Sequence, residues 1–242
     1  MAATATAPVR SRVLGVPVDL CDVRQRALEL AESGGQIITL NAEMTMAALE
    51  NPELRGAIEQ AELVIPDGAG VVWALGRQGH RVRRSPGIEL ARWLLDQAAA
   101  HGWRVALVGA SPQVLARLRQ RLLGELPNLR LVFAADGYCS SDAWPELQRQ
   151  LLAAEPQLVL VALGVPRQET WIASLPRPLA ALWMGVGGSF DVWAGEKRRA
   201  PGWMCSLRIE WLYRLIKEPT RWRRMLALPA FAGQVLRQGT SR

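Results

Sequence analysis

The sequence predicts an α/β fold, a Rossmann-like sandwich in which helices cover both faces of a parallel sheet, followed by a basic helical appendage. Short apolar runs of strand type alternate with amphipathic segments of about ten residues or more, and turn residues separate many of them. Strands joined through helices pair in parallel by right-handed crossovers. Near Gly195 this alternation gives way to tryptophans interleaved with arginines. The expected organisation is a flexible N-terminus (1–12), an α/β core (13–195) and the appendage (196–242).

The first predicted elements follow the flexible N-terminus. VLGVPV (13–18) is an apolar run typical of a strand, and residues 22–33 have the spacing of an amphipathic helix, which Gly34 and Gly35 end. Pro52 favours the start of a helix, because proline suits the first helical position. The elements predicted next are a strand at 36–40, helices at 42–50 and 52–60, a strand at 62–65 and a helix at 68–78.

The second half of the core repeats this pattern after a basic loop, GHRVRRSPG. Its strands are almost wholly apolar, as expected for strands that are buried on both faces of a parallel sheet. The predicted elements are a helix at 88–101, a strand at 103–109, a helix at 112–124, a strand at 129–136, a helix at 141–153, a strand at 157–164, a helix at 166–174 and a final strand with its turn at 179–188.

The composition excludes several classes of protein. Half of the 242 residues are apolar, which supplies a sizeable core, and no run approaches the roughly 18 apolar residues of a membrane span. The first residues, MAATATAPVRSR, lack the apolar region of a signal peptide, so the expected compartment is the cytoplasm. Cys21, Cys139 and Cys205 form no CxxC pair, and His80 and His101 show no ligand spacing. We expect neither a disulfide framework nor a zinc site.

Positive charge is concentrated in the appendage. The whole chain carries a net charge of +7, and residues 196–242 contribute +8 through eleven Lys or Arg against three Glu. A basic segment with tryptophans on a near-neutral body indicates a partner with negative charge and an apolar or planar surface, either an anionic membrane or a nucleic acid. The alternative is that the arginines merely solvate two surface helices.

Polar residues and glycines gather just after the predicted strands, where ligands bind in open α/β sheets. Glycines at such turns let backbone N–H groups approach a phosphate, with a helix N-terminus behind them. Taken alone, each glycine is better explained as easing its turn, but the set indicates a nucleotide-like ligand. The residues assigned to nucleotide binding are Gly109, Asp136, Gly137, Gly164, Gly187 and Asp191. Thr39, Asn41, Asp67 and Gln168 occupy equivalent strand-end positions.

The usual phosphate-binding motifs are missing from the sequence. It contains no GxxxxGK[ST] and completes no GxGxxG, so neither a P-loop nor the dinucleotide fingerprint is predicted. It also lacks an Asp-x-Asp pair that would clamp Mg²⁺ on a diphosphate. We therefore expect no metal and no cofactor. If a diphosphate leaves during the reaction, Arg84 and the arginines of the appendage must stabilise its charge.

Asp67 is the best candidate for a general base. It ends a predicted strand within IPDGAG, where its carboxylate is held rigidly while the neighbouring glycines leave a substrate hydroxyl room to approach. Asp is also a favoured N-cap residue, and capping of the following helix explains it equally well. On these grounds both roles stay open.

Seven motifs in order along the chain resemble the WecG/TagA/CpsF family of glycosyltransferases. The likeness runs over residues 13–224, and although each motif alone is weak, the ordered set is specific. The motifs are T-x-N (39–41), PDG-x-G-V-V (66–72), R-x-P-G (84–87), LGxPxQE (163–169), GVGGSFD (185–191), RAP (199–201) and EWLYRL-x-x-EP-x-R (210–221).

The resemblance implies an inverting glycosyltransferase that moves a sugar from a UDP-sugar to a polyprenyl-diphosphate-linked saccharide during cell-surface polysaccharide assembly. It implies that Asp67 is the catalytic base. The residues that it places in the active-site pocket are Thr39, Asn41, Arg84 and Gln168. It further implies that the appendage docks the enzyme on the cytoplasmic face of the inner membrane and brings arginines to the site, here Arg214, Arg221 and Arg224.

Two stretches depart from the family pattern. DGY at 136–138 stands where the family often has HGY, and GIEL at 87–90 replaces GxDL. Neither departure alters the implied reaction class. They bear on the sugar, for which N-acetylmannosamine, its uronic acid and glucose all stay open.

The appendage has a helical pattern with an apolar and a basic stripe. The apolar stripe comprises Leu207, Trp211, Leu212, Leu215 and Ile216, and the basic one comprises Arg214, Lys217, Arg221 and Arg224. Since Pro219 more often starts a helix than continues one, we expect a second helix and a bent basic face. Trp203, Trp211 and Trp222 suit an interfacial anchor, and Trp211 is also expected to pack against the core.

Two rival functions remain beside the transferase. A nucleic-acid-binding module also combines basic and aromatic residues, and a nucleotide-binding domain without turnover would use the same strand-end glycines. The ordered motifs favour the transferase, so no nucleic acid is expected. The expected partners are a UDP-sugar, a lipid-linked saccharide and an anionic membrane, and self-association into a homo-oligomer through the apolar tail is compatible with the sequence.

Overall fold

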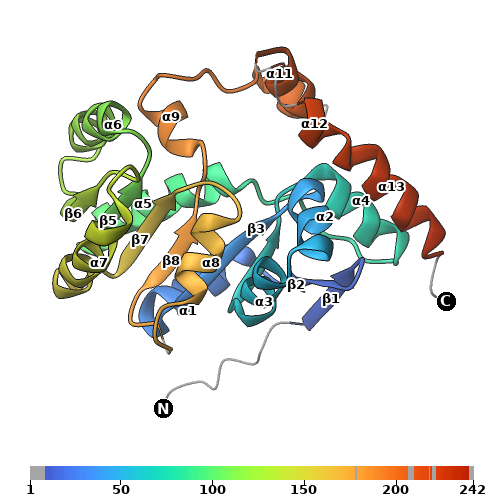
Figure 1. The fold of residues 1–242 in the computed structure, drawn as a ribbon, viewed down its shortest axis with the longest axis horizontal. Helices are drawn as coiled ribbons and strands as arrows, with labels where there is room; N and C mark the ends of the chain where they lie inside the picture. Colours follow the sequence, from blue (N-terminus) through green and yellow to red (C-terminus); the bar gives the residue numbers. More distant parts are fainter. Residues whose placement is uncertain (1–8, 178, 207–209, 218, 220–221, 240–242) are drawn as a thin grey trace.

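The computed structural model describes residues 9–177, 179–206, 210–217, 219 and 222–239. Its centre is a six-stranded sheet with the order β4-β3-β8-β7-β5-β6 (Figure 1). Every neighbouring pair in this sheet is parallel, which confirms the predicted fold class. The strands are β3 (Gly35–Leu40), β4 (Leu63–Pro66), β5 (Arg104–Gly109), β6 (Arg130–Ala135), β7 (Leu158–Ala162) and β8 (Leu182–Gly185).

The predicted helices of the core form close to the expected positions. Asp22 caps the first of them by accepting hydrogen bonds from the backbone of Arg24 and Gln25, and Gly34 ends it with φ +78°. The helices are α1 (Val23–Ser33), α2 (Ala42–Glu50), α3 (Pro52–Gln60), α4 (Ala69–Arg77), α5 (Gly87–His101), α6 (Pro112–Glu125), α7 (Trp144–Ala153) after a 3₁₀ turn (Ser141–Ala143), α8 (Arg167–Ala173) and α9 (Ser189–Trp193).

Helices cover both faces of the sheet because successive strand side chains point to opposite sides. Ile37 and Leu63 face a cluster that contains the buried sides of α1, α5, α6 and α9. Ile38 and Val64 face the opposite cluster, which α2, α3 and α4 complete, while α7 and α8 cover the other half of that face.

The N-terminal region differs from the prediction. Instead of one strand at 13–18, the chain forms an antiparallel hairpin of β1 (Val9–Val13) and β2 (Val16–Leu20). Leu14 and Gly15 make its two-residue turn with φ of +51° and +78°. A leucine seldom adopts this left-handed conformation, so the apolar run gave no sign of the turn.

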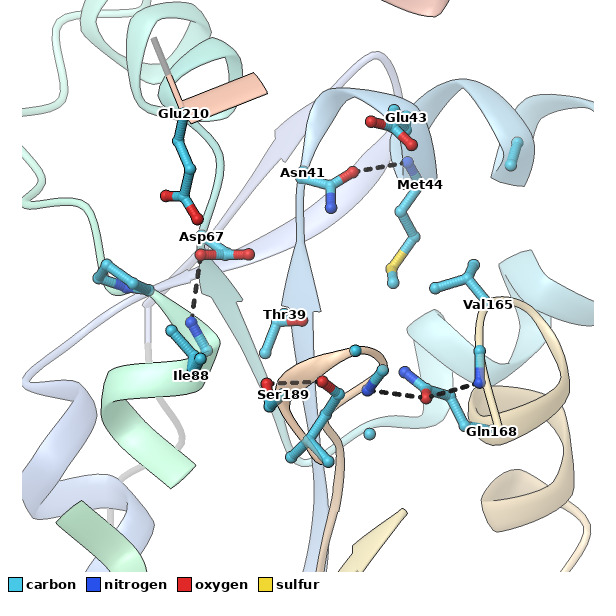
Figure 2. Close-up of a pocket in the computed structure, with 18 of the residues that line it drawn as sticks. Thr39, Asn41, Glu43, Met44, Asp67, Ile88, Val165, Gln168, Ser189 and Glu210 are labelled. Atoms are coloured by element: carbon cyan, nitrogen blue, oxygen red, sulfur yellow. Dashed lines mark hydrogen bonds between the residues drawn. The ribbon is translucent and has the colours of Figure 1, made fainter. Parts of the chain in front are cut away.

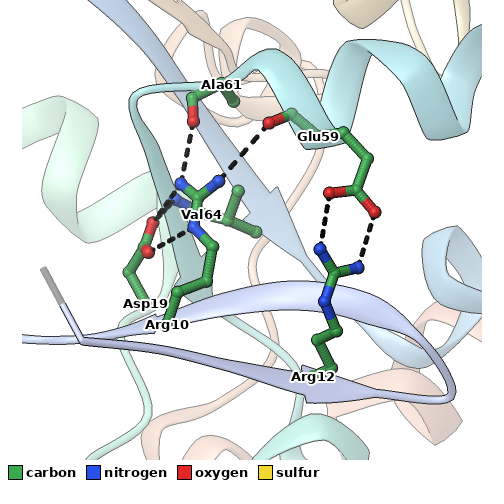
Figure 3. A network of polar contacts seen from close by, with 6 residues as sticks. All are labelled: Arg10, Arg12, Asp19, Glu59, Ala61 and Val64. Carbon is green, nitrogen blue, oxygen red and sulfur yellow. Dashed lines mark hydrogen bonds and ion pairs between the residues drawn. The ribbon is translucent and has the colours of Figure 1, made fainter.

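The strand β1 includes residues that were assigned to the flexible N-terminus. Arg10 pairs with the buried carboxylate of Asp19 at 2.7 Å and donates to the carbonyl oxygen of Ala61 at 2.9 Å (Figure 3). Asp19 also accepts from the backbone N–H of Val64 at 2.7 Å, so the hairpin is tied directly to β4. Arg12 makes a two-pronged pair with Glu59. These contacts fix the chain from Val9 onward.

The appendage is helical, and its last helix joins the core. Its helices are α10 (Gly202–Ser206), α11 (Glu210–Lys217), α12 (Trp222–Met225) and α13 (Ala227–Arg237). In Figure 1, α13 runs beside α2 and α4, while α11 and α12 stand away from the sheet. Phe231 and Val235 of α13 are buried in the same cluster as α2 and α4. The change in composition near residue 195 therefore does not mark the end of the packed domain.

Two expectations about the appendage can be compared with the structure. The helix α11 is described to Lys217 and α12 from Trp222, and residues 218, 220 and 221 lie outside the described residues, so the expected start of a second helix at Pro219 stays a prediction. Trp211 is 41% exposed and belongs to none of the hydrophobic clusters of the core, so the expectation that it packs against the core is not met. On the short helix α11 the apolar stripe turns partly outward. Across the part of the chain that the structure describes, no helix has the length and apolarity needed to cross a membrane.

Candidate active site

A cavity of about 1040 Å³ lies at the carboxyl ends of β3, β4, β7 and β8 (Figure 2). The appendage forms part of its wall through Glu210, Tyr213 and Lys217. The sequence-predicted residues that it gathers are Thr39, Asn41, Asp67, Arg84, Gly164, Gln168 and Gly187. The carboxyl-end rule for ligand sites thus points to the edge of the sheet at which this cavity lies.

Thr39 lies near the end of β3 and Asn41 directly follows the strand, and both line the cavity. Asn41 is the N-cap of α2, where its Oδ1 accepts from the backbone N–H of Met44 at 2.9 Å. An added Cβ at Gly68 would lie 2.9 Å from the Asn41 side chain, and one at Gly87 would lie 2.6 Å from the Thr39 methyl group. These two motif glycines are needed because neighbouring turns pack directly on Thr39 and Asn41.

Asp67 does not cap the helix that follows it. The N-cap residue of α4 is Gly68, which makes no side-chain capping bond. Asp67 is therefore not the N-cap residue of the helix that follows it. Oδ1 of Asp67 instead accepts from the backbone N–H of Gly87 at 3.1 Å, at the first residue of α5. The positive end of that helix dipole favours a negative charge here. This contact holds the Asp67 carboxylate at the wall of the cavity.

Arg84 links the Asp67 backbone to the appendage. Its Nε donates to the carbonyl oxygen of Asp67 at 2.6 Å, and its Nη2 pairs with Oε2 of Glu210 at 2.9 Å. The Glu210 side chain is only 9% exposed, and in Figure 2 its carboxylate points toward Asp67. Sequence reasoning did not select Glu210 as a site residue, although it opens the EWLYRL motif.

Gln168 is placed in the cavity wall, but it mainly bonds to the protein itself. Its Oε1 accepts from the backbone N–H groups of Gly164 and Gly187, at 3.2 Å and 3.1 Å. Two amides that were assigned to a phosphate are therefore already bonded to a side chain. The next residue, Glu169, was also not selected by sequence reasoning. Its burial raises the pKa of its carboxyl to about 7.

The remaining strand-end residues lie outside the cavity. The edge strand β6, which Asp136 and Gly137 follow, is separated from β3 by β5, β7 and β8. Gly109 ends β5, and an added Cβ there would lie 2.4 Å from the carbonyl oxygen of Ala162, so close packing already accounts for this glycine. Oδ1 of Asp136 accepts from the backbone of Tyr138. Asp191 belongs to α9 and is likewise absent from the cavity lining.

The structure describes only part of each arginine that the resemblance places at the site, or none of it. Arg221 lies outside the described residues, and for Arg214 and Arg224 only the backbone is described, within α11 and α12. Their roles stay predictions. Among the side chains that are described, no group of three or more His, Cys, Asp or Glu is arranged to hold a metal ion. The expectation of a metal-free site stays a prediction as well.

Comparisons with known proteins identify the family. The model of the WecG/TagA/CpsF glycosyl transferase family matches residues 11–242. An N-acetylglucosaminyldiphosphoundecaprenol N-acetyl-β-D-mannosaminyltransferase of Bacillus spizizenii is 35% identical over 209 residues, which cover 84% of this chain and 79% of the relative. A protein of the same name from Bacillus subtilis is 35% identical over 207 residues, covering 85% and 80%. The chain belongs to the WecG/TagA/CpsF family of glycosyl transferases.

Proposed function

We propose that this protein is an inverting glycosyltransferase that moves a sugar from a UDP-sugar to a polyprenyl-diphosphate-linked saccharide. The observation that carries the proposal is the setting of Asp67, a carboxylate held at a helix N-terminus in the wall of a large cavity. The names of both relatives specify an acceptor with a diphosphoundecaprenol group and a β-linked product. A single displacement on an α-linked nucleotide sugar gives a β product with inversion.

Asp67 is the base in this reaction. The acceptor hydroxyl gives its proton to the Asp67 carboxylate while its oxygen forms a bond to the anomeric carbon of the donor. The bond between that carbon and the UDP oxygen breaks, and UDP leaves with the electron pair. The bond from Gly87 N–H to Oδ1 keeps the carboxylate oriented throughout.

Arginines stabilise the charge of the leaving diphosphate in this proposal. Arg84 lies in the cavity wall, and the backbone of Arg214 and Arg224 belongs to the helices α11 and α12 next to it. Guanidinium groups bind phosphate oxygens through two parallel hydrogen bonds and keep their charge at all relevant pH values. This role makes a metal ion or a further cofactor unnecessary.

The appendage holds the enzyme at the cytoplasmic face of the inner membrane, where a lipid-linked acceptor is found. Its exposed apolar side chains are Trp203, Trp211, Ile216, Trp222, Leu226 and Leu236. Tryptophan favours the membrane–water interface, and the net charge of +8 on residues 196–242 attracts anionic lipid. Away from a membrane, the same apolar surface favours self-association.

The sugar is proposed from the relatives. Both relatives are named as transferases of N-acetylmannosamine, so this sugar is the first choice, ahead of its uronic acid and glucose. The test is UDP release from a panel of UDP-sugars with and without a short-chain polyprenyl-diphosphate sugar. Acceptor-dependent release from one donor supports the proposal and names the sugar. Absence of release from every donor, with folded protein and detergent present, favours a binding protein without turnover.

A further inference from the structure

Two glycine turns at the cavity are joined by one buried amide. Gly164 follows β7 and Gly187 follows β8, and both have left-handed backbone, with φ of +77° and +49°. Oε1 of Gln168 accepts a hydrogen bond from each of these turns, as Figure 2 shows. The residue is only 2% exposed. The distance between the Gly164 and Gly187 turns therefore depends on the position of the Gln168 side chain.

The amide of Gln168 has to keep one of its two orientations. Rotation by about 180° around its last bond would place its NH₂ group against two backbone N–H groups, so that donors would face donors. In the observed orientation Nε2 donates to Oε1 of Glu169 at 2.7 Å. An added Cβ at Gly185 would lie 2.6 Å from Nε2, so the space for this nitrogen exists because residue 185 is glycine.

Glu169 lowers the stability of the folded protein at this position. It is 2% exposed, and among the described residues its second oxygen, Oε2, has no hydrogen-bond partner. A buried carboxyl with an unpaired oxygen disfavours folding. The backbone around it is also fixed, since Nε2 of Gln36 on β3 donates to the Glu169 carbonyl oxygen at 3.2 Å. A purely structural role in this place would be filled at lower cost by an uncharged side chain.

We propose that Glu169 is a positioning residue for the transfer reaction, which acts through Gln168 to hold the Gly164 and Gly187 turns at the separation that the donor requires. Glu169 does not line the cavity, whereas Gln168 and both glycines do. The inference rests on the proposed function, because it assigns a role within the same site.

The kinetic test compares Glu169→Ala and Glu169→Gln with the wild type. We expect Glu169→Ala to raise the KM for the UDP-sugar about tenfold, because one hydrogen bond that orients Gln168 is lost. Glu169→Gln should stay within about threefold of wild type, since its carbonyl oxygen accepts the same bond. The matched control is Glu125→Gln, because Glu125 is exposed on α6 and pairs with Arg92 away from the cavity.

Amide hydrogen exchange tests the same idea without turnover. The Gly164 and Gly187 amides should both exchange at least about tenfold faster in Glu169→Ala, while the centre of β5 keeps its protection. If Glu169→Ala does not fold, Gly185→Ala displaces Nε2 from the other side and carries the measurement. A folded variant with unchanged exchange at both glycines overturns the inference. If the wild type itself transfers no sugar, the proposed function fails, and the exchange data still decide the role of Glu169.

Discussion

Arg84 holds the backbone of Asp67 and the carboxylate of Glu210 at the same time, through contacts of 2.6 Å and 2.9 Å. Asp67 follows β4 at the edge of the sheet, whereas Glu210 belongs to α11 of the appendage. The two residues are distant in sequence. The appendage is therefore in direct contact with Arg84, the residue that holds the backbone of Asp67, the proposed base. A shift of the appendage would reach Asp67 through the side chains of Glu210 and Arg84.

Glu210→Ala should weaken the transferase. It leaves Arg84 without this charged partner, and hydrogen bonds to charged groups contribute about 1.5–3 kcal/mol, so kcat/KM should fall roughly tenfold to a hundredfold. Steady-state kinetics with donor and acceptor measure the effect. Glu146→Ala, which removes the partner of Arg149 on α7 away from the cavity, is the control. Full activity of the Glu210 variant would separate the Arg84 pair from catalysis.

Asp67→Asn should abolish turnover without unfolding the protein. The amide oxygen of Asn can still accept from the Gly87 N–H, but it cannot take the proton of the acceptor hydroxyl. We expect a loss of about 10²–10⁴ in kcat, the range of general base catalysis. Affinity for the UDP-sugar, measured by calorimetry, should change by no more than a few fold. A fully active variant would show that another group is the base.

Glu169→Gln should change how stability depends on pH. Burial raises the pKa of Glu169 from 4.5 to about 7, so the folded protein holds a proton that the unfolded chain releases. This carboxyl therefore favours the fold below pH 4.5 and loses that contribution as the pH rises to about 7. Relative to wild type, the variant should gain about 2–3 kcal/mol between pH 5 and pH 8.

Denaturant unfolding of both proteins at the two pH values measures this gain. The nearest charged groups in the same hydrogen-bond network, Glu62 and Arg177, are connected to Glu169 through Gln36 and are present in both proteins, so the comparison isolates Glu169. An equal free-energy difference at pH 5 and pH 8 would mean that Glu169 titrates normally.

Membrane binding should depend on the exposed tryptophans of the appendage. Replacing Trp203 and Trp222 together by Ser removes two largely exposed indole rings, and at roughly 25 cal/mol per Å² of inserted apolar surface the partition coefficient should fall at least about tenfold. Co-sedimentation with anionic phosphatidylglycerol vesicles measures it. Tyr138→Ser, which changes an exposed aromatic residue beyond β6, should bind like wild type. Equal loss in both proteins would contradict a specific membrane face.

The sequence was most informative where local patterns decide the structure. Apolar runs and turn residues located all six strands of the main sheet, and the carboxyl-end rule brought Thr39, Asn41 and Asp67 to one cavity. The order of strands is a tertiary property that no local pattern contains. Asp136 therefore entered the predicted nucleotide site, although β6 is the edge strand on the other side of the sheet.

The residues that were missed depend on contacts that only the fold creates. Glu210 pairs with Arg84, which lies 126 positions earlier in the chain. Glu169 contacts its neighbour Gln168, whose amide fits only because residue 185, 16 positions after Glu169, is glycine. The hairpin turn at Leu14 was missed for a different reason, because it uses a backbone conformation that leucine seldom adopts. Neither the periodicity nor the composition of the sequence predicts these tertiary contacts or this turn conformation.

The packing of α13 on α2 and α4 fastens the far end of the appendage to the core, while its near end continues directly from α9. A truncation after residue 195 would remove Phe231 and Val235 from the core and expose the apolar surface of α2 and α4 that they cover. A loss of activity in such a truncated protein would therefore not distinguish a lost membrane contact from a damaged core. The same packing connects the appendage to the cavity. A displacement of α13 would be passed to α2, whose first turn is capped by Asn41 at the cavity.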